Sequence, residues 1–581
     1  MIQRGTMNRY ARLGAALLAI STAAGCGGSD DGAQPDATDP AGSSPAPSTP
    51  DASTPGQTSL APEPSAAPGS TAVPTGTAPS GEGSGSGAPG DPAEDDLCTE
   101  ERVGGELTVG VMSELPGLDP NIVSSASYSI GGQEMNAIWD SLVRWNPVTA
   151  AYEPHVAESL QPNDDGSVWT LTLREGVTFA NGDPLDADAV IASIERFATA
   201  QIAQVRLLES IASTTKVDDM TVEFTLTSPW GGFPFVLSAG PGYIVNTAVA
   251  AEVGDETFAL DPSSANLGPY ALDRFVPGEE LVLTARTDYW GGPVCIETLR
   301  FVTLPEPDLA LDAFENGEID YFVSESPIIV AELKDSEYPG LVGTVQPQQL
   351  MPNASPGAPG EDVRVRQAIQ HAVDVSVIND RAFEGTANVH TALVPDNSPF
   401  FTNGVTGPEY DPALASELVD AAKADGWDGK MGLVCRPEQQ EIAIAVEAML
   451  EAVGMDVEVE IVPTQENVDR VNNLDFDLTC YTLLILPEDP WTGINRNLSS
   501  ESTRTGYANP DFDAALQQLK VAADVDAQRE AMRSLETVWN ETAPGHMFAT
   551  FEGYMVWRPE VHGLKAHRQS TALFGDAWIE Q

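Results

Sequence analysis

The segment Trp169–Phe197 reads WTLTLREGVTFANGDPLDADAVIASIERF, and it is the part of the chain that says most about the fold. At its start, polar residues alternate with three apolar ones, Trp169, Leu171 and Leu173. A two-residue period of this kind is typical of a strand that buries one face. The segment therefore predicts a half-buried strand at its N-terminal end.

A turn and a helix are predicted directly after this strand. Within Asn181–Pro184, Gly182 tolerates a positive φ and the proline fixes its own φ, so the chain is expected to turn. Asp186 is placed to cap a helix. The apolar residues that follow it fall on one helical face: Val190, Ile191, Ile194 and Phe197. The residues alone thus predict a strand–turn–helix unit.

The N-terminus has the pattern of a secretory signal. Arg9 and Arg12 precede a short apolar run at 13–20, which is too short to span a membrane. Met7 is a second candidate start, because residues 7–26 already form a complete signal. The signal ends in Ala-Ala-Gly-Cys, which resembles a bacterial lipobox with Cys26 as the lipidated residue. Ordinary cleavage, with Cys26 discarded or left free, is the alternative.

A long low-complexity segment separates the signal from the rest of the chain. Residues 27–97 are almost all Gly, Ala, Ser, Thr, Pro and Asp, and they contain no Lys or Arg. Such a composition buries too little apolar surface to offset the entropy of ordering, so we expect a disordered tether. Its r.m.s. span would be roughly 45–50 Å. Residues 98–581 are too many for one simple core and predict at least two lobes.

The chain is strongly acidic, with a formal net charge of −59 at pH 7. Nucleic acid and anionic lipid headgroups would repel it. The acids are scattered along the sequence rather than clustered, which favours a solvated surface over a site for a cationic ligand. Nucleic acid is therefore not an expected partner.

The sequence of residues 169–197 resembles the signature of the family 5 solute-binding proteins, the peptide- and nickel-type receptors of bacterial ABC importers. In that family a Trp-containing strand leads into Leu-Arg-x-Gly-Val-x-Phe-x-x-Gly-x-Pro and an Asp-x-Val helix. Further motifs of the family occur here in the same order: Leu118–Pro120, Gly268–Tyr270 with Val276–Glu279 and Asp288–Gly291, Gly317–Asp320, Val365–Ile369 and Tyr507–Asp513. Asn266-Leu267 replaces the start of the usual Gly-Thr-Gly.

This resemblance implies an α/β, two-lobe periplasmic-binding-protein-like fold, with mixed sheets flanked by helices and a ligand cleft between the lobes. It also implies an extra subdomain in the first lobe and two crossovers, near 345–351 and Pro544. The expected divisions are a signal at 1–26, a tether at 27–97, lobe I at 98–348 with its subdomain at about 141–245, lobe II at 349–545, and a return to lobe I at 546–581.

The residues of the expected lobe II support this architecture independently. We predict strands at 431–434, 456–462 and 476–483, the last with its core at 477–479, and a helix at 437–452. A second helix is predicted between the last two strands. Alternating strands and helices indicate a parallel sheet with crossover helices. A further helix is predicted at 527–542, before the second crossover.

Four cysteines lie beyond Cys26, and no two of them have the spacing of a zinc site. An even number in an exported protein suggests disulfides, and four cysteines allow three connectivities. Because each pair falls in one expected lobe, we predict two bonds, Cys98–Cys295 and Cys435–Cys480. Cys435 and Cys480 end two predicted strands of one sheet. Free buried thiols are the alternative.

Catalytic constellations are not found in the sequence. It has no HExxH, no P-loop, no GxGxxG after a strand and no nucleophile elbow in the folded part. His371 is expected to be a packing or surface residue. Glu488 and Asp489 are adjacent in sequence, and adjacent residues on an extended chain point to opposite sides, so we do not expect them to form a general acid–base pair. We therefore expect a binding protein rather than an enzyme, with no cofactor and no metal.

Candidate ligand-binding residues come from both lobes, because a site between lobes needs groups from each side. In lobe I, the polar stretch after Leu118–Pro120 and two aromatic residues beside a Gly/Pro-rich run are candidates: Ser124, Ser125, Tyr128, Ser129, Trp230 and Tyr243. In lobe II, the segment after a strand's carboxyl end is favoured. Its candidates are Tyr481, Glu488, Asp489 and Trp491. Surface loops and ordinary core packing are the alternatives.

One departure from the family bears on the ligand. Peptide-binding members carry an acidic residue four positions before the proline of this lobe II loop, where it holds the peptide α-ammonium. Counting back from Pro490 gives Leu486, which cannot bind a cation. Glu488 or Asp489 would have to replace it. A peptide is the first expected ligand, and a saccharide, a cationic compound or a metal chelate is the alternative.

The expected function is therefore that of a monomeric, lipid-anchored receptor on the outer face of the cytoplasmic membrane. Its expected partners are the solute, the membrane through the anchor, and an ABC permease with its ATPase. A ligand-binding sensor that does not deliver cargo shares the same sequence features and remains open.

Overall fold

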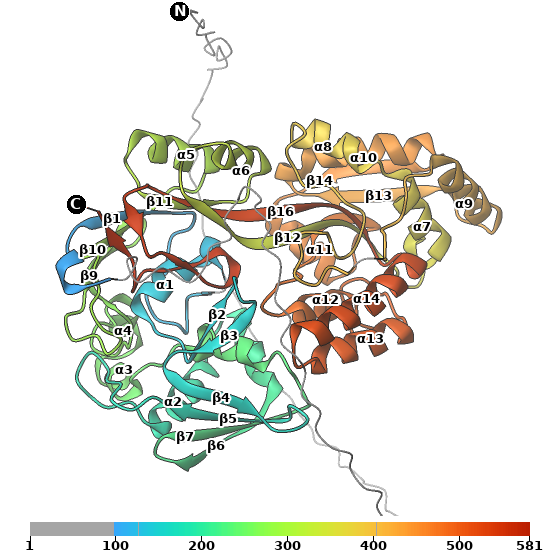
Figure 1. Cartoon of the computed structure of the whole chain (residues 1–581). Coiled ribbons are helices and arrows are strands. Elements are labelled where there is room, and N and C mark those ends of the chain that lie inside the picture. The colour runs from blue at the N-terminus through green and yellow to red at the C-terminus, as the bar shows by residue number, and fades with distance from the viewer. Residues whose placement is uncertain (1–97, 126, 403, 581) are drawn as a thin grey trace, which may run out of the picture. The chain divides into compact units, whose positions relative to one another are not determined.

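The computed structural model describes residues 98–125, 127–402 and 404–580. The predicted signal, Cys26 and the tether lie outside these residues. A single sheet of ten strands runs through the described part (Figure 1). Its spatial order is β14 (Asp456–Ile461), β13 (Lys430–Cys435), β15 (Leu478–Thr482), β12 (Gly340–Pro352), β16 (His546–Trp557), β11 (Tyr321–Ser324), β1 (Glu106–Val111), β10 (Thr298–Thr303), β9 (Glu280–Ala285) and β8 (Tyr270–Val276).

Two long strands, β12 and β16, join the halves of this sheet. They pair with each other antiparallel, from Gly340 opposite Val556 to Leu350 opposite His546. We call the part that carries β1 and β8–β11 lobe I, and the part that carries β13–β15 lobe II. The expected crossovers thus take the form of paired strands, because β12 contains the first predicted position and β16 begins directly after the second.

Lobe II has the predicted parallel arrangement. Strand β13 pairs parallel with both β14 and β15, and the connecting helices are α10 (Gln440–Ala452) and α11 (Thr464–Asn472). The helix predicted from Pro437 begins as one 3₁₀ turn, Pro437–Gln439, before α10. The prediction that Cys480 ends its strand is wrong, because β15 continues to Thr482 through its pairing with β12.

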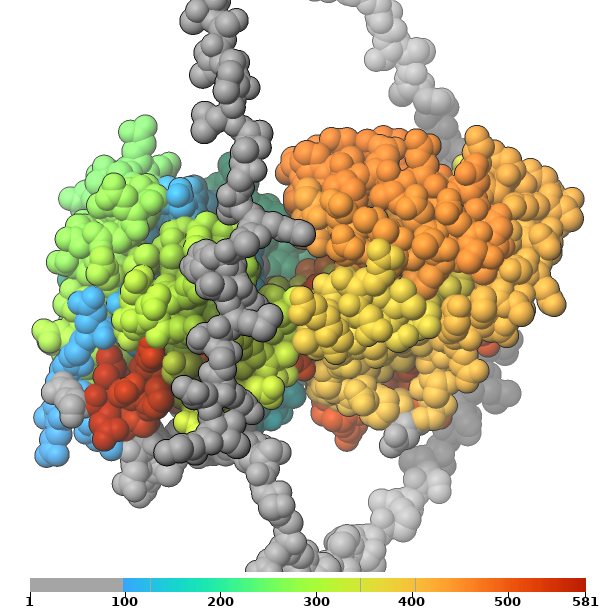
Figure 2. Space-filling view, turned by 90° about the horizontal axis from the view of Figure 1, so that it is seen from above, coloured from blue at the N-terminus to red at the C-terminus, as the bar shows by residue number. Residues whose placement is uncertain are grey.

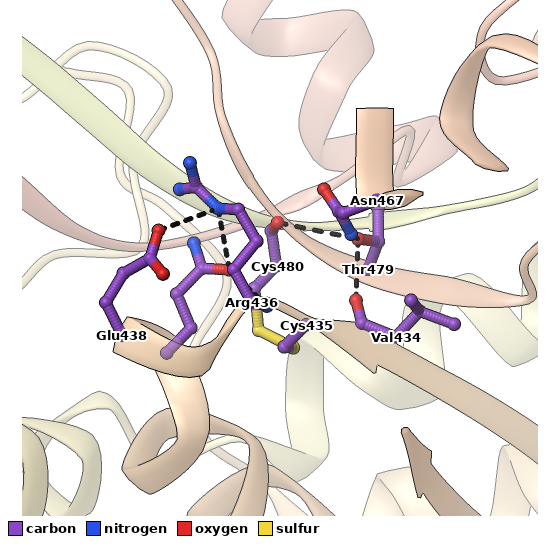
Figure 3. Close-up of a disulfide and its surroundings, with 8 residues drawn as sticks. Val434, Cys435, Arg436, Glu438, Asn467, Thr479 and Cys480 are labelled. Carbon is purple, nitrogen blue, oxygen red and sulfur yellow. Dashed lines mark hydrogen bonds and ion pairs between the residues drawn. A yellow bond between two sulfur atoms is a disulfide. The ribbon is translucent and has the colours of Figure 1, made fainter. Parts of the chain in front are cut away.

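The structure contains both predicted disulfides. Cys98 is bonded to Cys295, and Cys435 to Cys480, with sequence separations of 197 and 45 residues. The second bond joins the neighbouring strands β13 and β15 (Figure 3). Beside it, the hydroxyl of Thr479 donates to the Val434 carbonyl at 2.7 Å, which adds a second link between the two strands.

The opening segment forms the predicted strand–turn–helix unit in a separate antiparallel sheet. This sheet has the order β4 (Ala157–Pro162), β5 (Val168–Leu173), β7 (Thr221–Leu226), β6 (Ile211–Asp218). Trp169, Leu171 and Leu173 are buried on one face of β5. Gly182 has the expected positive φ of 88°, and Asp186 caps α2 (Ala187–Phe197) by accepting the Ala189 N–H at 2.9 Å.

Helices lie on both sides of the large sheet. Figure 1 shows α5, α6, α8 and α10 on one side and α12–α14 on the other, and the first group is visible from above in Figure 2. No helix in the described part combines the length and hydropathy needed to cross a membrane. The remaining α-helices and strands are α1 (Gly132–Ile138), α3 (Thr247–Val253), α4 (Asp255–Leu260), α5 (Pro307–Asn316), α6 (Pro327–Lys334), α7 (Val363–Ala372), α8 (Val375–Ala382), α9 (Pro412–Ala424), α12 (Pro490–Leu498), α13 (Pro510–Val521), α14 (Val525–Thr542), β2 (Val143–Asn146), β3 (Ala151–Pro154), β17 (Val561–His562), β18 (Lys565–Ala566), β19 (Ala572–Leu573) and β20 (Trp578–Ile579).

Candidate functional site

The loop at 483–489 lies where β15 ends and α12 begins. Open parallel sheets bind ligands at the carboxyl ends of their strands, so this is the position the fold favours for a site. Asp489 caps α12 by accepting the Thr492 N–H at 3.4 Å. Gly493 lets the helix pass close beneath the loop, because a Cβ there would lie 1.8 Å from the Leu484 carbonyl oxygen. The loop is therefore held tightly against its own helix.

Two buried carboxyl groups project from this loop. Glu488 is 4% exposed and Asp489 is 2% exposed. Within the described residues, Glu488 Oε1 and Asp489 Oδ2 have no hydrogen-bond partner. Burial raises the pKa of Asp489 to about 6, and it raises the pKa of Glu488 as well. Both groups therefore keep acceptor capacity that the protein itself does not use.

Leu486 stands at the loop position where the family resemblance leads us to expect an acid. It is buried, and it packs into the apolar cluster that contains Trp230 and the buried faces of β5 and β7. A carboxylate at this position would have to be buried among apolar side chains, at a large desolvation cost. Leu486 thus contributes apolar contact between the lobes instead of a charge.

Aromatic side chains from the two lobes meet beside the loop. Trp230 and Trp491 have ring centroids 5.6 Å apart. Lys520, at the end of α13, lies with Nζ 4.6 Å from the centre of the Trp491 ring and donates to Ser228 Oγ at 2.6 Å. The Gly231 N–H donates to the Lys520 carbonyl at 2.9 Å. These contacts bring the run after Trp230 against lobe II.

Two further side chains approach the loop from lobe I. The Tyr152 hydroxyl donates to the Glu488 carbonyl oxygen at 2.9 Å. Arg568 is 2% exposed, and its Nη1 donates to the Phe235 carbonyl at 3.3 Å and to Ser238 Oγ at 3.1 Å. Its charge acts on both carboxyl groups of the loop and opposes the rise in their pKa that burial causes.

We refer to this group of six side chains as the interlobe cluster: Tyr152, Trp230, Glu488, Asp489, Trp491 and Arg568. Four of its members were candidates from the sequence, whereas Tyr152 and Arg568 were missed. Neither lies in a chemical motif. The one available signal for Arg568 is that basic residues are scarce in this chain, with 28 Lys and Arg against 87 Asp and Glu.

The other candidates lie apart from this cluster. Tyr243 is buried in lobe I, where its hydroxyl donates to Asn136 Oδ1 at 2.6 Å, and Ser125 lies beside that hydroxyl. Ser124 is half-buried. Tyr128 is buried beside Glu325, whose carboxylate accepts the Gln346 side-chain N–H at 2.6 Å.

Tyr481 also makes its contacts elsewhere. Its hydroxyl accepts a hydrogen bond from Arg504 Nη1 at 2.5 Å, and both residues belong to lobe II. The half-buried Ser129 lies with its Oγ 3.0 Å from Ser127 Oγ. In the described ranges, no group of His, Cys, Asp and Glu side chains is arranged to hold a metal ion.

The chemistry of the interlobe cluster is that of recognition. It combines indole faces for apolar or flat groups, carboxyl oxygens that can accept from a cation, and one guanidinium that can donate to an anion. Its members come from both lobes, so a molecule bound among them would contact both sides at once. Such contacts would favour whichever arrangement of the two lobes lets the molecule reach both sides.

Comparison with known families identifies relatives of this chain. The family model described as bacterial extracellular solute-binding proteins, family 5 Middle, matches residues 151–504. Among curated proteins, the probable di/tripeptide-binding protein 5 of Pseudomonas aeruginosa is 22% identical, with 81% of this chain and 95% of the relative covered. The match therefore extends well beyond one motif.

Solved structures show the same fold. The periplasmic binding protein DppA from Helicobacter pylori, in complex with peptide STSA, aligns with a TM-score of 0.68 and 21% identity, covering 83% of this chain and 99% of that one. NikA from Brucella suis, in complex with Fe(III)-EDTA, aligns with a TM-score of 0.68 and 24% identity, covering 82% of this chain and 100% of that one. Both are two-lobe binding proteins.

Proposed function

Because the chain belongs to family 5 of the bacterial extracellular solute-binding proteins, we propose that it captures a peptide between its lobes and delivers it to an ABC permease. Relatives named as di/tripeptide-binding and dipeptide-binding proteins support a peptide as the solute. The similarity to the structure with peptide STSA supports only the shared fold, given its 21% identity.

One observation carries the peptide assignment, namely the pair of buried carboxyl groups with unused oxygens at Glu488 and Asp489. A buried ammonium without a carboxylate would carry a large desolvation cost. These two groups stand two and three positions after Leu486, close enough for the loop to supply an acid to the same end of a ligand. We propose that they replace the missing anchor and that Trp491 covers the adjoining part of the ligand.

The hinge of this receptor is proposed to be the strand pair β12 and β16. They join the two halves of the large sheet, and a bulge interrupts their pairing between Val342 and Thr344. We therefore keep the division into lobe I at 98–348 with its subdomain at about 141–245, lobe II at 349–545 and a return at 546–581. Closure would bring the loop of lobe II onto Tyr152 and Trp230, as periplasmic-type binders close on a ligand.

Anchoring is proposed to occur through a lipid on Cys26, with the tether at 27–97 holding a monomeric receptor off the outer face of the cytoplasmic membrane. The support is the Ala-Ala-Gly-Cys sequence at the end of the signal. Five further candidates from the sequence, Ser124, Ser125, Tyr128, Tyr243 and Tyr481, stay proposed ligand-binding residues, and any contact they make with a ligand would lie outside the interlobe cluster.

The proposed function is tested by identifying the natural ligand and then its fate. Protein purified from its own host is denatured, and the released molecules are identified by mass spectrometry, with peptides as the expected result. A deletion strain should then lose uptake of those peptides. A released saccharide, cationic compound or metal chelate would overturn the peptide assignment, and unchanged uptake after deletion would favour a sensor.

A further inference from the structure

We infer that a pocket in lobe I, with the buried side chain of Glu134 at its inner end, binds a primary alkylammonium group such as the end of a lysine side chain. The pocket lies where α1, the end of β1 and the hairpin of β8 and β9 meet (Figure 1). None of its lining residues belongs to the interlobe cluster, so the inference does not depend on the proposed function.

The carboxyl group of Glu134 has acceptor capacity that the protein itself does not use. Glu134 is 2% exposed, and its Oε2 atom has no hydrogen-bond partner within the described residues. Burial raises the pKa of this group to about 7, and no basic side chain of the described part of the chain offsets the rise. A buried carboxylate without a partner is costly, and a cation beside it would remove that cost.

Another acid of lobe I, Glu325, provides a comparison. Burial raises the pKa of Glu325 to about 7 as well. Its carboxylate, however, accepts hydrogen bonds from the Gln346 side chain, at 2.6 Å, and from the Tyr128 hydroxyl. The two acids therefore differ in their hydrogen bonds and not in how far burial raises their pKa. The unused oxygen is a property of Glu134 and of its pocket.

The walls of the pocket suit an alkyl chain. Four apolar side chains line it: Leu115, Phe275, Leu281 and Phe301. The cavity volume is about 20 Å³, which is room for one water-sized group such as an ammonium. A lysine side chain buries its methylene stem along apolar surface and carries its charge at the tip, which matches apolar walls that lead to a carboxyl group. A guanidinium is larger and has five donors to satisfy.

The charges around the pocket favour a cation. Glu114 and Glu279 line it and are exposed, and no Lys or Arg is among its lining residues. Glu280 also lines it, but this carboxylate is paired with Arg274 at 2.8 Å and with Arg300 at 3.2 Å. The two exposed acids are therefore the ones that attract a positive group to the mouth of the pocket.

Other occupants fit the pocket less well. In the described ranges, no group of His, Cys, Asp and Glu side chains is arranged to hold a metal ion, and apolar walls offer no oxygen ligands. A water molecule fits the volume but leaves the charge of the buried carboxylate unbalanced. An alkylammonium supplies both the N–H donors and the charge. A lysine of a partner protein has this chemistry, and so has a small free amine.

The test measures the unfolding temperature of the full-length protein at pH 8 in n-butylammonium chloride. The reference is tetramethylammonium chloride at the same ionic strength, a salt whose cation has no N–H donor. The n-butylammonium salt should raise the unfolding temperature of the wild type by about 1 °C or more over the reference, as expected for a ligand at tenfold excess over its Kd. Glu134→Gln should lose this shift, whereas Glu325→Gln, outside the pocket, should keep it. Glu114→Gln/Glu279→Gln, which changes exposed positions only, should reduce it.

Two further arms identify the source of the amine and exclude the cleft. Nα-acetyl-lysine methylamide should act like n-butylammonium if a lysine of a partner enters the pocket, whereas an effect of n-butylammonium alone assigns the pocket to small free amines. Glu488→Ala/Asp489→Ala should keep the shift, since the interlobe cluster is not involved. Equal shifts in the wild type and Glu134→Gln, no shift beyond that in tetramethylammonium, or loss of the shift in Glu488→Ala/Asp489→Ala each overturn the inference.

Discussion

The pH dependence of peptide binding tests the role of Asp489. Burial raises the pKa of this carboxyl group to about 6 in the ligand-free protein. A peptide ammonium prefers the ionised carboxylate, so below pH 6 a proton competes with the ligand. The ionised fraction falls from about nine-tenths at pH 7 to about one-tenth at pH 5, which predicts about a tenfold loss of affinity. Glu488, whose pKa is also raised, acts in the same direction.

Ionisation of Asp489 favours peptide binding but lowers the folding stability of the ligand-free protein. The pKa of Asp489 is higher in the folded state than in the unfolded state, so protonation of this group stabilises the fold. This contribution is complete below the unfolded pKa of 3.8 and is lost as the pH rises through about 6. Ionised Asp489 therefore destabilises the ligand-free protein at pH 7 by up to about 3 kcal/mol, from 1.36 kcal/mol per pKa unit. Asp489→Asn should stabilise the ligand-free protein at pH 7 while weakening peptide binding.

The assay is calorimetric titration of Ser-Thr-Ser-Ala from pH 5 to pH 8, together with urea unfolding of the ligand-free protein. Asp489→Asn should reduce the change of peptide affinity between pH 5 and pH 7. Glu134→Gln is the matched control, since burial raises the pKa of Glu134 to about 7 but this residue lines a separate cavity in lobe I. A wild-type affinity that is constant from pH 5 to pH 7, or an Asp489→Asn variant whose affinity changes with pH as the wild type's does, would contradict this role of Asp489.

Three further predictions concern the disulfide, the aromatic contact and the anchor. Replacing both Cys435 and Cys480 by alanine should destabilise lobe II by about 4 kcal/mol in urea unfolding, from the loop-closure entropy of a 45-residue separation; an unchanged midpoint would contradict this. Trp491→Ala should weaken peptide binding about tenfold in calorimetry through lost aromatic and cation–π contacts, whereas Trp427→Ala, beyond α9, should not; equal effects would argue against the aromatic contact. Cys26→Ala should release folded protein from membranes in a fractionation assay, and continued membrane retention would exclude the lipid anchor.

Local patterns in the sequence were enough to predict much of the fold. The strand–turn–helix unit at 169–197 and the parallel strands of lobe II depend on periodicity, turn residues and caps that act over a few residues. The disulfide pairs followed once each cysteine was assigned to a lobe. These features were predictable because the interactions that form them are short in sequence or are restricted to one lobe.

The interlobe cluster was only partly predictable, because its contacts join distant parts of the chain. The Tyr152 hydroxyl meets the Glu488 carbonyl across 336 positions of sequence. Arg568 lies on a turn whose left-handed backbone has no glycine to mark it. Likewise, the continuous pairing of β12 with β16 is a tertiary contact that no local pattern indicates. Leu486 showed that the usual anchor was missing, but only the structure showed what surrounds it.

In the proposed complex, the two buried acids of the lobe II loop hold the peptide. The most direct measurement is calorimetry of a peptide recovered from the native protein, titrated into the wild type and into the Glu488→Ala/Asp489→Ala double variant. We predict that the wild type binds the peptide and that the folded double variant loses at least about 30-fold in affinity. Equal affinity of the two proteins would contradict it.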